Sequence, residues 1–471
     1  MAPNSSSPAS FKVYVRWRPL STSESGTAEF KHTTSEQDEN AKHSISLTAS
    51  TPAQAAKTTP KTKTWNSGPS FTGVFDASND NRHVYDQAVA PMLPHVLQGG
   101  TCNLFAYGHS GSGKTHTIIG YDFEDEMRLG LSMATARDLF TAISASSKHE
   151  CGDDDDVRGG EELSIAVRLY EIRGSSAFDL LNVNGSTECH VREGADGQTH
   201  IRGATELLSD GRVRVRPIRA VACPVFPALR DTVLVGLRNR KTGSSSVHDE
   251  SSRTHAILEL EIVSVRLMEA REALIERESE LVPVGKRATD VYIEEQMKSL
   301  IKKEDGSYTQ NPDRHLNQAR IDAAEAEKAV FERRVADAEE VIANCFKESR
   351  EKALGGKFVF VDLAGSEYYD TSNMGGPKQT PQEKKQGRQI STDLFALKEV
   401  IRARAEGKAR IPFRSSPLTM VLRSHFVEGH NGGKGESRSA MILTVSPAEN
   451  MFAATMNTLK YGNLVGLGTG P

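Results

Sequence analysis

The sequence predicts an α/β protein whose central, mostly parallel sheet is covered by helices on both faces. Apolar, β-rich segments alternate with segments of helical periodicity along the 471 residues, which is typical of parallel sheets with crossover helices. A glycine-rich loop at 108–115 directly follows an apolar, strand-like run. The alternation resumes after a highly charged stretch at 266–355. We therefore expect one large α/β domain over residues 11–471, interrupted by an insertion.

The amino-terminal part predicts a tail, a strand and a surface excursion. Residues 1–10 are rich in serine and proline and are expected to form a loose tail. The segment FKVYVRWRPL at 11–20 predicts a strand that ends at Pro19. Residues 21–70 contain few large apolar side chains and predict a surface excursion, with some β structure near 44–48.

Strands and helices alternate from residue 71 onward. Helices are predicted at 84–100, 133–143 and 226–243. Strands are predicted at 102–108, 163–174, 211–221 and 254–265, and again from residue 357. The arginine side chains of 211–221 are expected to face solvent.

The charged stretch at 266–355 predicts a helical insertion. Within 321–345 a stripe recurs at heptad-like spacing: Ile321, Ala324, Lys328, Phe331, Val335, Ala338, Ile342 and Cys345. Three interpretations stay open: a helix pair packed on itself, a coiled-coil helix for a partner chain through 321–345, or disorder.

Composition excludes several classes of protein. The chain has no run of about 18 apolar residues, so no membrane span is expected, and its first residues lack the pattern of a signal peptide. Five scattered cysteines without a Cys-x-x-Cys pair argue for a reducing compartment and against zinc or a disulfide framework. A net charge of −4 argues against a globally basic nucleic-acid binder.

Residues 108–115, GHSGSGKT, have the spacing of a phosphate-binding loop. Its glycines let backbone N–H groups curl around phosphates, Lys114 adds a positive charge, and Thr115 offers a hydroxyl to Mg²⁺. A helix that follows the loop is expected to point its N-terminus at the anion. The alternative is a simple glycine-rich turn, but the strand before the loop favours a nucleotide site.

Two later segments narrow the choice of nucleotide protein. HDESSRTH at 248–255 precedes a strand, and DLAGSE at 362–367 ends one. An acid at a strand end can hold Mg²⁺ through water, and the glycine three residues later can present its N–H to a γ-phosphate. Their order after the phosphate loop makes the set specific.

From about Phe11 to Tyr461, apart from the insertion, the chain resembles the kinesin motor domain. The segments that carry the resemblance are VRWRPL (15–20), AYGHSGSGKTHT (106–117), SSRTH (251–255), DLAGSE (362–367), IPFRSSPLT (411–419) and TVSPAENMFAATMNTLKYG (444–462). The resemblance implies a mostly parallel eight-stranded sheet, ATP and Mg²⁺ as ligands, a microtubule-stimulated ATPase activity, tubulin as partner, and a place on the cytoplasmic cytoskeleton.

The resemblance also implies nucleotide-binding residues. Arg16, Arg18 and Pro19 would border the adenine, with His116 just beyond the phosphate loop. The loop itself would hold the phosphates through Gly108, His109, Ser110, Gly111, Ser112, Gly113, Lys114 and Thr115.

The catalytic roles implied by the resemblance belong to two switch segments. Ser252 and, through water, Asp362 would join Thr115 at Mg²⁺, and Ser251 would lie near the lytic water. Gly365 would sense the γ-phosphate. Arg253 and Glu367 would form the ion pair that closes the switches and orders the attacking water.

A basic face is expected to bind the acidic microtubule surface. Its cations are Lys384, Lys385, Arg388, Arg402, Arg404, Lys408, Arg410, Arg414 and Arg423. The alternative is a solvated helix surface without a partner.

Several positions depart from the kinesin pattern. His248 stands for an Asn, His109 for a Gln and Pro417 for a Lys, and residues 390–394 read Ile-Ser-Thr-Asp-Leu where kinesins usually have Ile-Asn-x-Ser-Leu. Segments such as ALKEVIRA at 396–403 look most like the internal-motor, microtubule-depolymerising kinesins.

Three functions therefore compete. The first is a microtubule motor ATPase. The second, motivated by His248, Ser391 and Pro417, is a non-motile module that binds nucleotide and tubulin with little turnover. The third, a kinase for a small metabolite, leaves the switch motifs unexplained.

Overall fold

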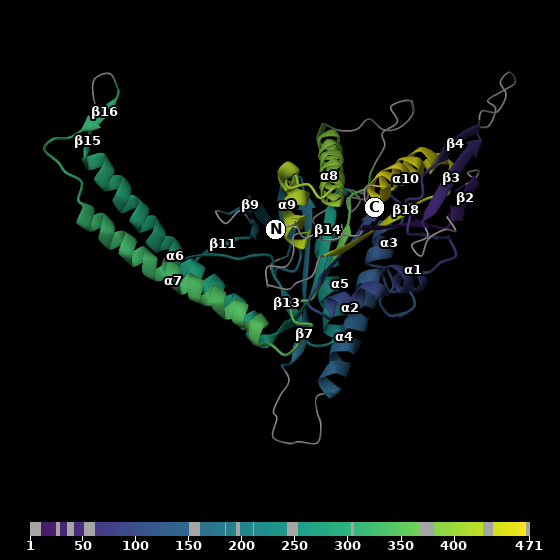
Figure 1. The fold of residues 1–471 in the computed structure, drawn as a ribbon, viewed down its shortest axis with the longest axis horizontal. Coiled ribbons are helices and arrows are strands. Elements are labelled where there is room, and N and C mark those ends of the chain that lie inside the picture. Colours follow the sequence, from purple (N-terminus) through teal and green to yellow (C-terminus); the bar gives the residue numbers. More distant parts are fainter. Residues whose placement is uncertain are drawn as a thin grey trace, which may run out of the picture. The chain divides into compact units, whose positions relative to one another are not determined.

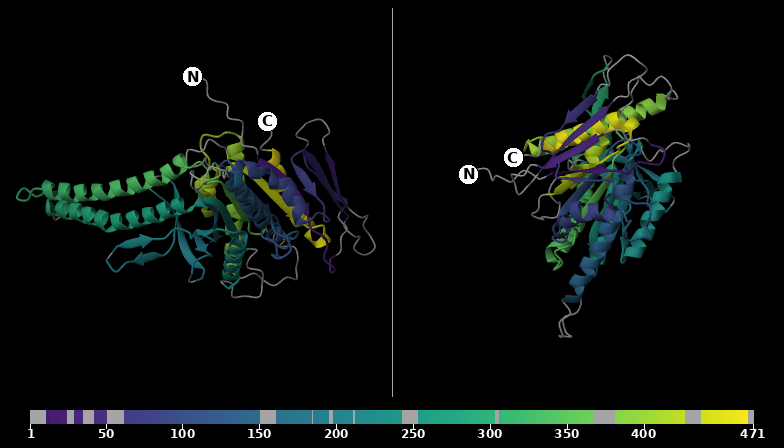
Figure 2. Two further views of the ribbon diagram at one scale, coloured as in Figure 1. Left: turned by 90° about the horizontal axis from the view of Figure 1, so that it is seen from below. Right: turned by 90° about the vertical axis from the view of Figure 1, so that its right-hand side faces the viewer.

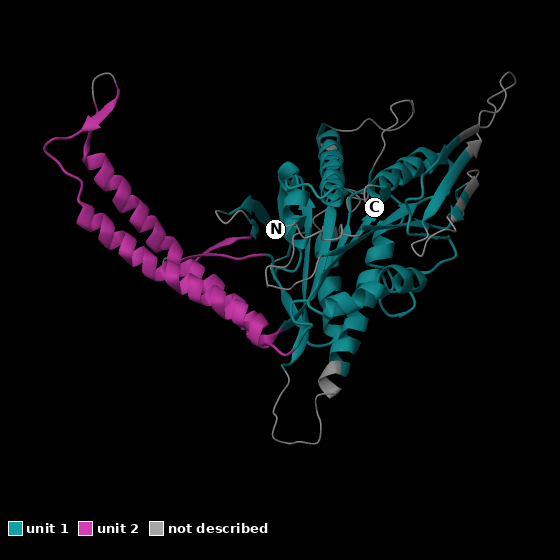
Figure 3. Ribbon diagram, in the orientation of Figure 1, with its two compact units in different colours: residues 1–201, 218–263, 351–471 teal, residues 202–217, 264–350 magenta. Residues whose placement is uncertain are grey.

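The computed structural model describes most of the chain as two compact units (Figure 3). The described residues are 11–24, 29–34, 42–50, 62–149, 161–183, 185–194, 198–210, 212–242, 253–302, 306–366, 381–426 and 437–467. Unit 1 comprises residues 1–201, 218–263 and 351–471, and unit 2 comprises 202–217 and 264–350. Within the described residues, no helix has both the length and the apolar character needed to cross a membrane.

A large sheet forms the centre of unit 1 (Figure 1). The strand order is β10-β9-β8-β7-β14-β17-β6-β18-β1-β5, with β13 paired to β7 off this path. The strands are β1 (Phe11–Trp17), β5 (Gly73–Phe75), β6 (Thr101–Tyr107), β7 (Leu163–Arg173), β8 (Ser176–Asp179), β9 (Thr187–Glu193), β10 (Thr199–Arg202), β13 (Val221–Cys223), β14 (His255–Ser264), β17 (Lys357–Asp362) and β18 (Arg438–Val445).

The centre of this sheet is parallel, as the sequence predicts. Strands β17, β6, β18, β1 and β5 are parallel neighbours, whereas β14 runs antiparallel to β17, and β7, β8 and β9 form an antiparallel meander. The fold class is thus confirmed. The described part of the chain forms an eleven-stranded sheet rather than the eight strands implied by the resemblance, because the edge is extended by the meander and its short companions.

Helices cover both faces of the sheet (Figure 2). One face packs against α8 (Pro381–Ala405), η3 (Phe413–Ser415), α9 (Pro417–Phe426) and α10 (Phe452–Leu467), which follows η4 (Glu449–Met451). The other side carries α1 (Asn81–Ala88), η1 (Ala90–Met92), α2 (Leu93–Val96), α3 (Lys114–Ile118), α4 (Leu131–His149) and α5 (Phe226–Thr242). Side chains alternate along each strand, so both faces of the central strands are buried.

One predicted helix is broken. Residues 84–100 form the end of α1, the short η1 and the short α2 instead of one helix. Pro91 and Pro94 cause the break, because proline lacks an N–H and clashes with the preceding helical turn.

The excursion at 21–70 contains a small antiparallel sheet. Its strands are β2 (Glu29–Thr34), β3 (His43–Ser50) and β4 (Thr62–Asn66). The β structure predicted near 44–48 is part of β3, whose Ile45 and Leu47 are buried.

Unit 2 is built on two long helices, α6 (Val265–Lys298) and α7 (Gln318–Glu348), which form an antiparallel hairpin (Figure 3). A β-ribbon of β15 (Leu300–Lys302) and β16 (Tyr308–Gln310) lies at its tip, and β11 (Thr205–Leu207) pairs with β12 (Val213–Val215). On α7 the predicted stripe is shielded, and Ile321 and Cys345 are buried. The stripe therefore packs within the hairpin.

The prediction that the arginines of 211–221 face solvent holds for Arg219, which is exposed, but is wrong for Arg214 and Arg216. Arg216 Nη1 lies 2.6 Å from Glu272 Oε1, and Arg214 pairs with Glu276, both on α6. Alternation along the strand does place Arg214 and Arg216 on the same face, but that face is covered by helix α6 of the insertion rather than by water.

Candidate nucleotide site

The phosphate loop connects the buried end of β6 to α3. Gly111 and Gly113 have φ of 72° and 100°, in the left-handed region that favours glycine. Lys114 is buried, and its Nζ donates to the carbonyl oxygens of Gly108 (3.1 Å) and His109 (2.9 Å). The loop thus encloses the ammonium group. The helix that follows the loop, α3, has only five residues, so its dipole contributes little to anion binding.

Thr115 and Asp362 meet at the carboxyl ends of two parallel strands. Asp362 ends β17 and is in register with Ala106 of β6, so it lies beside the loop. Thr115 Oγ1 donates to Asp362 Oδ2 at 2.7 Å. Asp362 is 2% exposed, and its Oδ1 has no hydrogen-bond partner among the described residues. A hydroxyl beside a buried carboxylate with an open oxygen is a donor set that fits Mg²⁺.

A buried ion-pair network supports Asp362, and the sequence analysis missed it. Arg240 of α5 places Nη1 3.4 Å from Asp362 Oδ2 and Nε 3.5 Å from Glu171 Oε2. Thr254 Oγ1 donates to Glu171 Oε2 at 2.8 Å. The signal in the sequence is Glu171, a glutamate next to apolar side chains of the β7 run LSIAVRLYEIR, which requires a partner once the strand is buried.

The segment that follows β17 is tied to the phosphate loop. Ser366 N donates to Gly108 O (3.0 Å), and Leu363 N donates to Ala106 O (3.2 Å). Gly365 is buried between these two bonds. The predicted γ-phosphate sensor therefore lies beside the loop that would hold the phosphates.

Of the predicted adenine-side residues, Arg16 and His116 lie at α3. Arg16 is buried and donates to Asn81 Oδ1 (2.6 Å) and Thr117 Oγ1 (2.9 Å), and its burial lowers its pKa to about 10. Arg18 Nη1 pairs with Glu24 at 2.6 Å. His116 and Pro19 are exposed, and the His116 ring lies 5.6 Å from that of Tyr121. Contact with an adenine stays a prediction.

The remaining loop side chains are packed inside the protein or against its backbone. His109 is 3% exposed, and its Nδ1 lies 2.8 Å from Ser110 O. Burial lowers the pKa of His109 to about 4, so the ring is neutral at pH 7. Ser112 Oγ lies 2.7 Å from Thr444 Oγ1 of β18.

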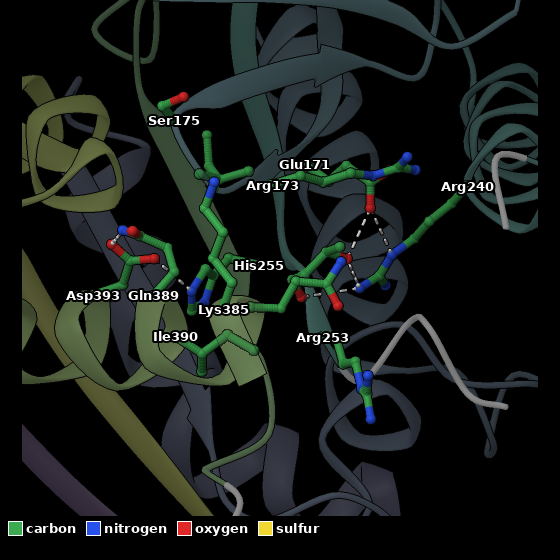
Figure 4. A pocket seen from close by; sticks show the side chains of 14 residues that line it. Glu171, Arg173, Ser175, Arg240, Arg253, His255, Lys385, Gln389, Ile390 and Asp393 are labelled. Carbon is green, nitrogen blue, oxygen red and sulfur yellow. Dashed lines mark hydrogen bonds and ion pairs between the residues drawn. The ribbon is translucent and has the colours of Figure 1, made fainter. Parts of the chain in front are cut away.

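A cavity of about 570 Å³ opens beside the network (Figure 4). Its wall includes Glu171, Arg173, Arg240, Arg253, His255, Lys385, Gln389 and Asp393. Arg253 thus faces the space next to the proposed site. Ser251, Ser252 and Glu367 lie outside the described residues, so the Arg253–Glu367 pair and the Ser252 contact to Mg²⁺ stay predictions.

The predicted track-binding cations form two groups. Lys384, Lys385 and Arg388 are exposed on the first turns of α8, and Arg410 is exposed further along. The others lie near acids or an aromatic ring: Arg402 with Glu399, Lys408 with Glu406, Arg414 and Arg423 with Glu193, and Arg404 over Phe426. Within the described residues, three exposed cations therefore lie close together at the start of α8.

The loop at the end of β6 and the acid at the end of β17 define a P-loop nucleotide-binding protein. A family model of the kinesin motor domain matches residues 16–284 and 330–466. The chain belongs to the kinesin motor domain family, which confirms the resemblance. The unmatched residues 285–329 lie in unit 2.

Relatives and a solved structure agree with this assignment. Kinesin-like protein KIF24 of Mus musculus and of Homo sapiens are each 25% identical over 395 residues, which is 84% of this chain and 20% of theirs. Kinesin-like protein KIN-13A of Oryza sativa subsp. japonica is 28% identical over 397 residues, 84% of this chain and 34% of its own. The chain thus spans a fifth to a third of these relatives' lengths. A solved fast kinesin shares the fold, with a TM-score of 0.53, 20% identity and coverage of 98% of this chain and 92% of its own.

Proposed function

We propose that this domain is a microtubule-stimulated ATPase that couples ATP hydrolysis to movement along, or disassembly of, microtubules. The observation that carries the proposal is the contact between Thr115 Oγ1 and Asp362 Oδ2, with Lys114 enclosed by the adjacent loop. Membership of the kinesin family supports the choice of nucleotide and track. The likeness to KIF24 and KIN-13A favours the depolymerising branch as the subclass to test.

The residues of the chain would divide the chemistry as follows. Lys114 and the loop hold the phosphates, and Thr115, Ser252 and Asp362 hold Mg²⁺. When bound, Mg²⁺ neutralises phosphate charge. Arg240, which is itself held by Glu171, fixes the Asp362 carboxylate. Phosphoryl transfer to water needs positioning and charge stabilisation more than covalent help.

Switch closure would supply the rest of the positioning. Gly365 lies next to the phosphate loop and is placed to sense the γ-phosphate. Arg253 would pair with Glu367 and order the attacking water, with Ser251 beside it. Because α8 begins shortly after this switch and carries Lys384, Lys385 and Arg388, a movement of α8 would link the nucleotide to the proposed track-binding face.

The alternative function is a non-motile module that binds nucleotide and tubulin with little turnover. Two of the unusual residues are accommodated by ordinary local structure. Ser391 Oγ donates to Gly387 O within α8 (3.0 Å), and Pro417 is the first residue of α9, where proline is favoured. Neither residue disturbs the Thr115–Asp362 contact, so we favour the ATPase.

Steady-state ATP hydrolysis with and without microtubules tests the proposal. We expect strong stimulation, and a Glu367→Ala variant should lose about 10²-fold or more in kcat, the usual cost of losing a group that positions the water. Binding of a fluorescent ATP analogue should survive this change. A matched control, Glu339→Gln on the exposed side of α7, should hydrolyse ATP like the parent. Nucleotide binding without any stimulation would support the non-motile module instead.

A further inference from the structure

Helix α8 carries a buried carboxylate at a position where kinesins usually have a serine. Asp393 is 2% exposed and points from α8 toward the cavity beside the nucleotide site (Figure 4). Its Oδ1 accepts a hydrogen bond from Gln389 Nε2 at 3.0 Å, one turn earlier on the same helix. Its Oδ2 lies 3.6 Å from His255 Nε2. The carboxylate therefore faces a residue of the sheet core.

His255 joins that carboxylate to the strand ends of the nucleotide site. The ring is 2% exposed, and its Nδ1 accepts a hydrogen bond from the backbone N–H of Ala364 at 3.0 Å. A ring that accepts at Nδ1 carries its proton at Nε2, which is the atom facing Asp393. Ala364 directly precedes Gly365. The imidazole of His255, the first residue of β14, thus lies between α8 and the segment that follows β17.

The surroundings make this contact costly to break. A buried carboxylate is unfavourable unless a donor or a cation stays close. The charged groups around the cavity are Arg253 before β14, Lys385 on α8, Arg173 and Glu171 on β7, and Arg240 on α5. Glu171 already binds Arg173 and Arg240. A serine at 393 would carry no charge, so moving α8 away from His255 would cost less.

We infer that Asp393 is a positioning residue that holds α8 against His255 and raises the free energy needed to move α8 away from the switch strands. The role of Asp393 in an ATPase cycle rests on the proposed function, in which α8 would connect the nucleotide to the microtubule. The contact itself exists whether or not ATP turns over.

Hydrogen exchange of the whole chain tests the contact without turnover. In Asp393→Asn and Asp393→Ser, amides of α8 near residue 393 should exchange about tenfold faster, because the buried carboxylate that lies 3.6 Å from His255 Nε2 is lost. Exchange in α7 and in β6 should not change. The matched control Thr392→Ala alters the exposed neighbour on the same helix and should leave α8 protection as it is. Unchanged protection in both Asp393 variants, or a loss spread over all of unit 1, would overturn the inference.

Steady-state kinetics test the role in the cycle. Asp393→Ser should raise the microtubule-stimulated kcat by about threefold or more while the KM for ATP stays within about twofold, because ATP contacts are untouched. An unchanged or lower kcat would overturn the inference. If the unaltered chain shows no ATPase activity, the proposed function fails, and the exchange experiment alone decides on Asp393.

Discussion

The two units of this protein differ in how deeply their ion pairs are buried. In unit 1, strand β14 is buried along its whole length and still carries Glu259 and Glu261. In unit 2, many ion pairs lie on helix surfaces, as in Arg266–Glu348, where both side chains are 54% exposed, although Glu295 is buried. The comparison shows that the contribution of an ion pair to stability depends on where the remaining charge lies once its partner is removed. In the sheet the remaining charge stays buried without a partner, whereas on the surface of the hairpin it is hydrated by water.

The buried charges around β14 form a network across three strands and a helix, separate from the one that supports Asp362. Glu259 accepts from Tyr170 OH at 2.8 Å and lies 3.2 Å from His425 Nε2, while Glu261 lies 2.8 Å from Arg168 Nη1. Burial alone would raise the pKa of Glu259, but His425, Lys357 and Arg168 outweigh it and hold that pKa well below its ordinary value. Every carboxylate in the network thus depends on its cations.

Breaking the network should give the largest effect. Arg168→Met leaves Glu261 buried without its closest cation, and we expect a loss of about 3–5 kcal/mol in the free energy of unfolding. Arg216→Met is the matched control in unit 2, where a half-exposed pair with Glu272 is worth about 0–1 kcal/mol. Urea unfolding followed by circular dichroism measures both. Equal losses for the two variants would remove the difference between the units.

The phosphate loop should make unit 1 sensitive to acid. The pKa of His109 is about 4 in the folded protein, below its ordinary value, so the unfolded chain binds a proton first as the pH falls. Stability is therefore complete above about pH 6.5 and declines down to about pH 4, with about 2 kcal/mol lost by about pH 5. Urea midpoints at about pH 7 and pH 5 measure this loss.

Two variants isolate the contribution of His109. His109→Gln, which installs the residue usual in kinesins, should lose less stability than the parent between the two pH values. His315→Gln, an exposed position in unit 2, should behave like the parent. A parent and a His109→Gln variant with the same pH dependence would contradict the buried, neutral state of the ring.

The sequence predicted the parts of unit 1 that follow from strand order. Lys114, Thr115 and Asp362 were predictable because a motif gives their chemistry, and parallel strands bring their carboxyl ends to one edge. Arg240 and the Asp393–His255 contact were not, because each depends on which helix packs over which strand. Ser251, Ser252 and Glu367 lie outside the described residues, so their roles stay predictions.

The predictions that were wrong or incomplete can be traced to particular residues and their neighbours. Pro91 and Pro94 were visible in the sequence and do break the predicted helix. The partners of Arg214 and Arg216 were not visible, because the spacing of a strand says nothing of what covers it. In unit 2 the heptad-like stripe identified the buried face of α7 but left its partner open, and the structure supplies α6.

The smallest effect should come from the hairpin itself. Arg287 Nη1 lies 3.5 Å from Glu327 Oε1, and the two side chains are 58% and 46% exposed. Arg287→Ala should change the stability of the hairpin by no more than about 0.5 kcal/mol, because both charges stay hydrated and the packing with α7 remains. Hydrogen exchange across α6 and α7 measures this, with Glu327→Ala and the double variant completing a cycle. A coupling energy above about 1.5 kcal/mol, the scale expected for buried charged contacts, would mean that the hairpin depends on its surface pairs as the sheet depends on its buried ones.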